Sequence, residues 1–154
     1  MKKRVVFLCL LSMCLALPAW SVETASEIEL TRSVIQTQKK AIIAKNMAFT
    51  EAEAEAFWPV FREYQQALQP INDRKVTLIM DYAENFEKLS NDQAKGMIED
   101  FLNIQKDEVK LKKKFVRRFS KVIPIKKVAR YYQLENKMDS VINIELAANI
   151  PLIQ

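Results

Sequence analysis

Between residues 49 and 89 the apolar residues recur mostly every three or four positions. This spacing places their side chains along one seam of an α-helix and predicts a long helix over residues 49–89. Lys75 alone interrupts the seam. Pro59 and Pro70 lie within it, and because the seam keeps its phase past both, we expect kinks rather than breaks. The seam residues are Phe57, Phe61, Tyr64, Leu68, Ile71, Leu78, Tyr82, Phe86 and Leu89.

Three further stretches have helical periodicity. Residues 27–45 predict a first helix, residues 91–123 a third helix and residues 125–148 a last one, followed by an apolar tail expected to pack on the body. The apolar face of the third helix covers about half of its circumference. The sequence has one glycine, which argues against a sheet, whose tight turns use glycine. We expect an all-α fold, an elongated curved helical hairpin of about four helices, two of them long and kinked.

Two capping signals predict where the long helices begin. Thr50 is followed three residues later by Glu53, and Ser90 is followed at the same distance by Gln93. In a capping box the hydroxyl accepts the backbone N–H of the third residue, whose side chain accepts the N–H of the cap. Helices are therefore expected to start directly after Thr50 and Ser90.

The first 21 residues have the pattern of a secretory signal peptide. Lys2, Lys3 and Arg4 precede an apolar run at residues 5–17, which is too short to span a bilayer, and small residues at Ala19 and Ser21 suit a signal peptidase. A retained membrane anchor is the alternative. A lipid-anchored form is disfavoured because neither cysteine follows a small residue. Residues 22–154 then form a single helical domain.

Cleavage would leave little chemistry for catalysis. Cys9 and Cys14 lie in the predicted signal peptide, and the sequence contains no histidine. The remaining chain therefore has no thiol or imidazole to act as a base, nucleophile or soft metal ligand, and no glycine-rich phosphate loop. We expect no enzyme, no catalytic residue, no cofactor and no metal site.

The charge is unevenly distributed along the chain. Residues 22–100 contain nine basic and fourteen acidic residues, whereas residues 101–154 contain twelve basic and five acidic ones. A basic stripe on the third helix could bind an acidic protein, a polyanion or anionic lipid. The alternatives are a solvated face or charge pairing with a second chain. Nucleic acid is not expected outside the cytoplasm. The stripe residues are Lys106, Lys110, Lys113, Arg117 and Lys121.

An aromatic cluster opens the long helix. Phe57, Phe61 and Tyr64 belong to the seam, whereas Trp58 lies about a quarter-turn away from it. Trp58 is therefore a candidate for an exposed contact with a client or partner. The alternative is a place at the edge of the core.

The stretch Leu-Ser-Asn-Asp-Gln at residues 89–93, together with Phe-Thr-Glu-Ala-Glu at residues 49–53, resembles the paired LTxxQ motifs of the Spy/CpxP group of periplasmic stress proteins. The resemblance implies a periplasmic location and two curved helical hairpins paired as an antiparallel homodimer. It also implies a basic and apolar cradle that holds unfolded clients without ATP. Related members modulate envelope-stress sensors, and others sense metals through histidine, which this chain lacks.

We therefore expect an exported protein that binds unfolded or envelope proteins, as a holdase-like chaperone or an envelope-stress modulator. Its candidate surface combines Trp58 with the basic stripe. The alternative is a structural adaptor that docks, through the basic C-terminal half, to one folded envelope partner or to the membrane surface without spanning it.

Overall fold

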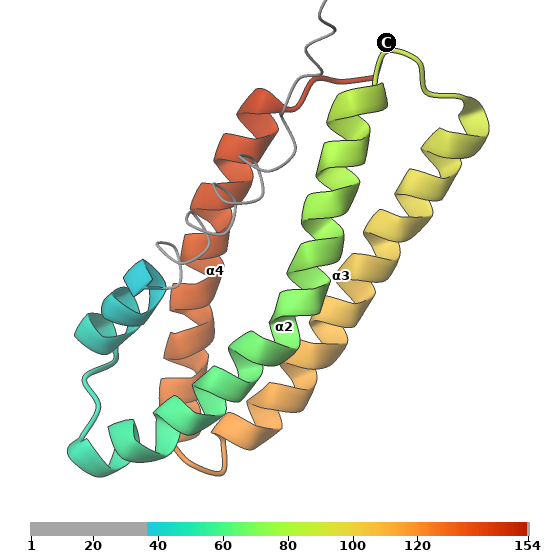
Figure 1. The fold of residues 1–154 in the computed structure, drawn as a ribbon. Helices are drawn as coiled ribbons and strands as arrows, with labels where there is room; N and C mark the ends of the chain where they lie inside the picture. Colours follow the sequence, from blue (N-terminus) through green and yellow to red (C-terminus); the bar gives the residue numbers. More distant parts are fainter. Residues whose placement is uncertain (1–36, 154) are drawn as a thin grey trace, which may run out of the picture. The chain divides into compact units, whose positions relative to one another are not determined.

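The helices of this protein are joined by short connections (Figure 1). The computed structural model describes residues 37–153, and the chain divides into two compact units, Met1–Gln38 and Lys39–Gln154. The predicted signal peptide and the start of the first predicted helix lie outside the described residues. Within residues 37–153 the chain is all-α, as predicted. Its helical segments are residues 37–47, α2 (Glu51–Asn85), α3 (Asn91–Phe119) and α4 (Ile125–Asn149).

Both predicted capping boxes are present. The Thr50 backbone N–H donates to Glu53 Oε2 at 2.8 Å, and the Glu53 N–H donates to Thr50 Oγ1 at 3.3 Å. At α3 the Ser90 N–H donates to Gln93 Oε1 at 3.0 Å, and the Gln93 N–H donates to Ser90 Oγ at 3.3 Å. Each box satisfies two backbone donors that a helix start would otherwise leave without partners.

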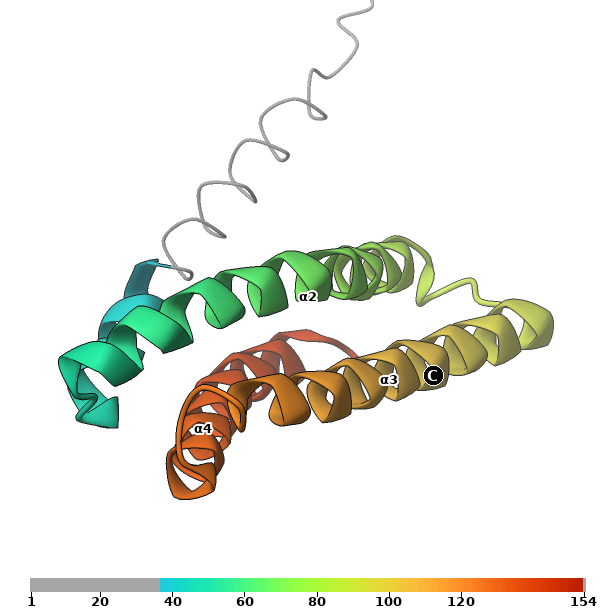
Figure 2. The same ribbon diagram turned by 90° about the horizontal axis from the view of Figure 1, so that it is seen from below.

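The long helix α2 continues through both of its prolines. Pro59 and Pro70 lie inside its 35 residues, and α2 is visibly bent in Figures 1 and 2. The helix ends at Asn85, four residues earlier than the predicted end at Leu89. A turn comes next, closed by the Lys88 N–H donating to the Asn85 carbonyl at 2.9 Å. This turn leaves Ser90 extended, the conformation that a cap residue needs.

The end of α3 differs from the prediction in the same way. The periodicity predicted a helix to Ile123, but α3 ends at Phe119. The N–H groups of Lys121 and Val122 donate to carbonyls three residues back, at 3.1 and 3.0 Å, so the chain tightens into a turn. The turn brings Ile123 into the core, where it is buried outside any helix.

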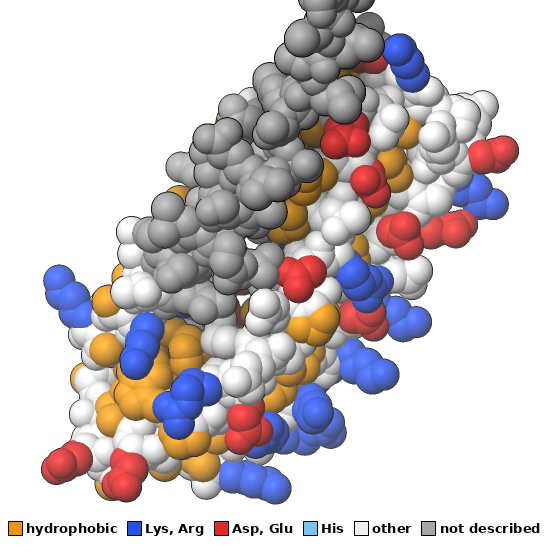
Figure 3. Space-filling model, viewed as in Figure 1, with side chains coloured by type: hydrophobic (Ala, Val, Ile, Leu, Met, Phe, Trp, Pro, Cys, Tyr) orange, Lys and Arg blue, Asp and Glu red, His pale blue; other side chains and the backbone are white. Residues whose placement is uncertain are grey.

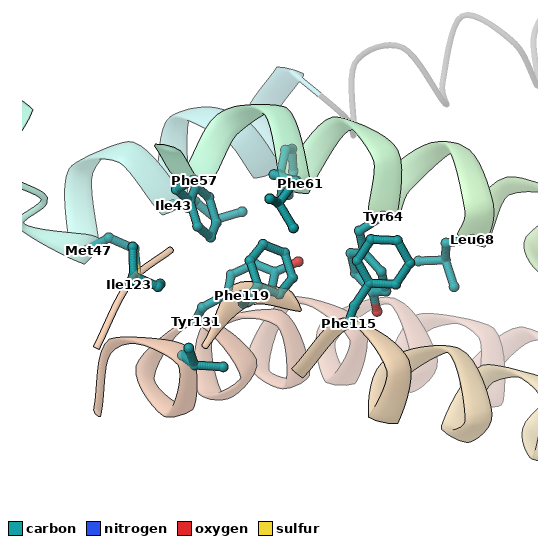
Figure 4. Close-up of a cluster of buried hydrophobic side chains, with 12 residues drawn as sticks. Ile43, Met47, Phe57, Phe61, Tyr64, Leu68, Phe115, Phe119, Ile123 and Tyr131 are labelled. Carbon is teal, nitrogen blue, oxygen red and sulfur yellow. The ribbon is translucent and has the colours of Figure 1, made fainter. Parts of the chain in front are cut away.

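Aromatic side chains dominate the hydrophobic core. Phe57 of α2 stacks on Phe119 of α3 with ring centroids 5.1 Å apart, and its edge meets Tyr131 of α4 at 5.3 Å. Tyr64 packs on Phe115 at 5.0 Å. Figure 4 shows these rings meeting between the helices. The buried cluster comprises Ile43, Met47, Phe57, Val60, Phe61, Tyr64, Leu68, Phe115, Phe119, Ile123, Val128 and Tyr131.

Burial is concentrated at one end of the helices. α2 packs along α3, whereas α4 approaches α3 near their connection and then diverges from it (Figure 2). The seam of α2 is accordingly buried from Phe57 to Leu68 but only half-buried from Ile71 to Leu89. Lys75 is half-buried as well, and its Nζ donates to Asn143 Oδ1 of α4 at 3.2 Å.

Apolar side chains remain exposed on α3 and on the C-terminal tail. On the broad apolar face of α3, Ile98, Leu102 and Val109 are 60, 55 and 50% exposed. The C-terminal tail meets α2 through a hydrogen bond from the Tyr82 hydroxyl to the Pro151 carbonyl, at 2.6 Å. The side chain of Leu152 is nevertheless 87% exposed. Diverging helices cannot bury both sides of α3 or cover the tail.

Candidate protein-binding surface

The predicted basic stripe runs along one side of α3. Lys106, Lys110, Lys113 and Arg117 are separated by four, three and four residues, so they lie above one another on the helix. All four side chains are exposed. Lys121 is also exposed, but it lies in the turn after the helix. Figure 3 shows basic side chains gathered along the edge of the molecule that α3 forms.

The acidic residues nearest in sequence to the basic stripe are paired with other cations. Asp107 pairs with Arg74 of α2 at 2.7 Å, and Glu108 pairs with Lys112 at 2.5 Å. Within residues 37–153, none of the five stripe residues forms an ion pair. The positive charge of this surface therefore faces solvent, which favours contact with anionic groups.

Exposed apolar side chains run beside the basic stripe. Ile98, Leu102 and Val109 lie within about 40° of one another around α3, at 100° for each residue. By the same count the middle of the basic stripe lies about 70° away from them. The three side chains are half or more exposed, so the helix presents apolar and cationic groups side by side.

Trp58 lies half-buried at the edge of the core. Its ring meets Phe57 and Phe61 edge-on, with centroids 5.2 and 5.4 Å apart, and also meets Phe49 at 6.4 Å. The ammonium of Lys40 is 5.5 Å from the centroid of the Trp58 ring. The indole thus packs between α2 and the helix of residues 37–47.

The structure does not bring Trp58 next to the basic stripe. The ion pair of Glu63 with Arg118, at 2.5 Å, marks the flank of α2 that faces α3. Trp58 precedes Glu63 by five residues and therefore lies about 140° around α2 from it. Trp58 and the basic stripe are two separate features of the surface.

A buried carboxylate is the feature that the periodicity did not reveal. Glu135 of α4 is 1% exposed. It accepts hydrogen bonds from the hydroxyls of Tyr64 at 3.3 Å and Tyr131 at 3.4 Å, and from the ammonium of Lys39 at 3.2 Å. Lys39 also lies 3.9 Å from Asp139. The carboxylate is thus held by side chains of residues 37–47, α2 and α4. The sequence signal was its position four residues after Tyr131, on the buried side of α4.

Burial governs the protonation of this network. Loss of water raises the pKa of Glu135 and outweighs the attraction of Lys39 and Lys112, while the nearby Asp139 raises it further. Burial and the negative charge of Glu135 also raise the pKa of Tyr64 and Tyr131, so both hydroxyls remain hydrogen-bond donors. These hydrogen bonds connect α2, α4 and the helix of residues 37–47, and the carboxylate that they share has a raised pKa.

The described residues show neither a clustered metal site nor a membrane-spanning helix. Residues 37–153 contain no group of three or more histidine, cysteine, aspartate or glutamate residues that could hold a metal ion. Across the same range no helix is both long and apolar enough to cross a membrane. What the surface does provide is a set of cations beside exposed apolar side chains.

No protein-family model matches this sequence, and neither the curated proteins nor the solved structures compared with it give a match.

Proposed function

We propose that this chain is an exported helical protein that binds other proteins of the bacterial envelope, as a holdase-like chaperone or an envelope-stress modulator. The single observation that supports the proposal best is the outer side of α3. There, exposed Ile98, Leu102 and Val109 run beside cations that have no ion-pair partner among residues 37–153.

Such a surface suits an unfolded client. Unfolded chains expose apolar side chains and carry acidic ones, and a helix that offers both kinds of contact binds many sequences weakly. The resemblance at residues 49–53 and 89–93 to the LTxxQ motifs supports the same reading, since both matched segments are the capping boxes of the long helices. The proposal extends to an antiparallel homodimer in the periplasm.

A structural adaptor for one folded envelope partner is the second candidate. The separation of Trp58 from the basic stripe favours the adaptor, because a folded partner can bind the basic stripe without contacting Trp58. Selectivity and salt distinguish the two functions. An adaptor bound through exposed charges has one partner and weakens as salt rises, whereas a chaperone acts on unrelated clients through apolar contact.

Light scattering of two unrelated aggregating proteins tests the proposal, with and without this chain, at low and high salt. We expect suppression of both, most of it retained in salt. The double variant Leu102→Ser/Val109→Ser should lose most of the suppression, whereas Ile144→Ser, which changes a 69% exposed side chain of α4, should retain it. Suppression of neither client would overturn the chaperone function and leave the adaptor.

A further inference from the structure

The outer flank of α3 combines two parallel stripes on a single helix. The apolar stripe is Ile98, Leu102 and Val109, and the basic stripe on the helix is Lys106, Lys110, Lys113 and Arg117. The apolar stripe spans residues 98–109 and the basic stripe residues 106–117, so the two overlap over residues 106–109 and together extend over about 28 Å at 1.5 Å for each residue. Exposed Glu99 lies on the basic side before Lys106, so the uniformly cationic part begins at Lys106.

This flank faces away from the rest of the hairpin. The buried residues of α3 are Ile104, Phe115 and Phe119, which turn toward α2 and α4. Counting 100° for each residue, the basic stripe lies about 180° from the middle of that buried face. Its cations can therefore approach an external surface together, without the hairpin standing in the way.

The flank is also one-sided. Side chains that are 50 to 60% exposed have no second element standing over them among residues 37–153. A bound peptide helix would need a groove with walls on both sides, whereas an unfolded client can meet a one-sided surface through weak contacts. A bilayer also needs no groove, because lipid headgroups rearrange around the side chains.

We propose that α3 is an interfacial helix that binds the surface of an anionic phospholipid bilayer through its two stripes. The ammonium and guanidinium groups contact lipid phosphates, and Ile98, Leu102 and Val109 enter the boundary between headgroups and acyl chains. Lysine and arginine suit this place, because their long stems run along the apolar surface while the charge stays at phosphate level. The helix lies in the plane of the membrane and does not cross it.

Because the stripe is cationic, binding is expected to depend on anionic lipid, on the number of stripe cations and on salt. Each lysine or arginine near an anionic membrane surface is attracted by the negative surface potential, and this attraction strengthens binding about fivefold for each cation. Losing two stripe cations should therefore weaken binding about 25-fold. The same attraction falls off within a Debye length, so binding should weaken steeply as salt rises.

Vesicle sedimentation with the full chain tests the proposal. The vesicles are phosphatidylcholine alone or phosphatidylcholine with phosphatidylglycerol, each at low and high salt. The test variant is Lys110→Gln/Lys113→Gln. The matched control is Lys45→Gln/Arg62→Gln, which removes the same charge from exposed positions of residues 37–47 and α2. Any lipid binding by the apolar run at residues 5–17 is common to all variants and does not respond to changes in α3.

We expect binding to the anionic vesicles that falls about 25-fold in the test variant and little in the control. The variant Ile98→Ser/Leu102→Ser should also bind less, with an unchanged circular dichroism spectrum. Equal losses in the test and control variants would overturn the proposal, as would equal binding to both kinds of vesicle. Binding of wild-type chain to acidic proteins but not to anionic vesicles would assign the flank to a protein partner instead. The vesicle assay contains no client protein. A negative result would therefore overturn lipid binding by α3 without deciding the chaperone function, which the light-scattering assay tests.

Discussion

At the scale of single residues, Glu135 is the most informative position. Its carboxylate is buried among aromatic rings and joins α4 to Tyr64 of α2 and to Lys39. A buried charge is costly unless it is paired and hydrogen-bonded, and removing one partner strands the other. Here two hydroxyls and one ammonium meet that need. Glu135 therefore links α4 to α2 and to the helix of residues 37–47.

Glu135 should give this protein a pH-dependent stability of unusual sign. Its pKa in the folded protein is raised by burial, whereas in the unfolded chain a glutamate titrates near about 4.3. The folded state therefore binds the proton more tightly. This contribution is fully present below the unfolded pKa and is lost as pH rises through the folded pKa. Each pH unit between the two pKa values changes the unfolding free energy by about 1.4 kcal/mol.

Urea unfolding of wild type and Glu135→Gln, from pH 4 to pH 7, measures the effect. The unfolding free energy of wild type relative to the variant should fall as pH rises, because only wild type must deprotonate a buried group. Other carboxylates titrate in both proteins and cancel in the difference. Glu84→Gln, at an exposed position of α2, is the control and should run parallel to wild type. A constant difference between wild type and Glu135→Gln would contradict the raised pKa.

At the scale of elements, capping boxes of neighbouring residues set the starts of α2 and α3, and the box of α2 also contacts α4. Glu53 closes the capping box of α2 and also pairs with Lys127 in the first turn of α4. The ammonium of Lys127 donates as well to the Ala48 carbonyl at 2.9 Å. Bonds from Lys127 and from the Thr50 N–H lower the pKa of Glu53. One cap thus connects two helices, whereas the box of Ser90 with Gln93 makes only local bonds.

Removing either cap hydroxyl should destabilise the protein. Thr50→Ala and Ser90→Ala should each lower the unfolding free energy by about 1 kcal/mol, because a backbone N–H at the helix start loses its acceptor. Thermal and urea unfolding report the loss. Thr77→Ala is the matched control, since Thr77 is exposed within α2 and alanine favours a helix interior. Unchanged stability in both cap variants would show that these boxes contribute nothing.

At the scale of the whole described unit, burial falls from one end to the other. The aromatic cluster closes the end where α3 connects to α4, and divergence of α4 leaves the other end half-buried. Regions with few buried apolar contacts open locally at lower free energy than the core. The two ends of the same helices should therefore differ in protection.

Hydrogen exchange with mass spectrometry measures this difference. Amides in residues 74–85 of α2 and 92–101 of α3 should exchange at least about tenfold faster than those in residues 57–68 and 112–119, because the latter lie within the buried cluster. Equal protection at both ends would contradict the burial gradient. Protection of the open end that grows with protein concentration would show that a second copy covers it.

The local sequence determined the helices among residues 37–153 and the starts of α2 and α3 after Thr50 and Ser90. These features depend on spacing and on cap residues a few positions apart, which neighbouring residues decide. It also identified the basic stripe of α3, since that is a property of one helix. The ends of α2 and α3 were placed four residues too late. The turns at residues 86–88 and 120–123 interrupt an apolar pattern that by itself continues, because each turn redirects the chain toward the next helix.

Only the tertiary structure decided which apolar residues become core. Periodicity assigns a face to a helix, but burial requires a second helix over that face, and the divergence of α4 leaves Ile98, Leu102 and Val109 exposed. Only the packed helices bring the Glu135 carboxylate within hydrogen-bond distance of Tyr64, Tyr131 and Lys39. The pattern of apolar residues along the sequence does not contain the distances between helices, because packing of their aromatic side chains sets those distances.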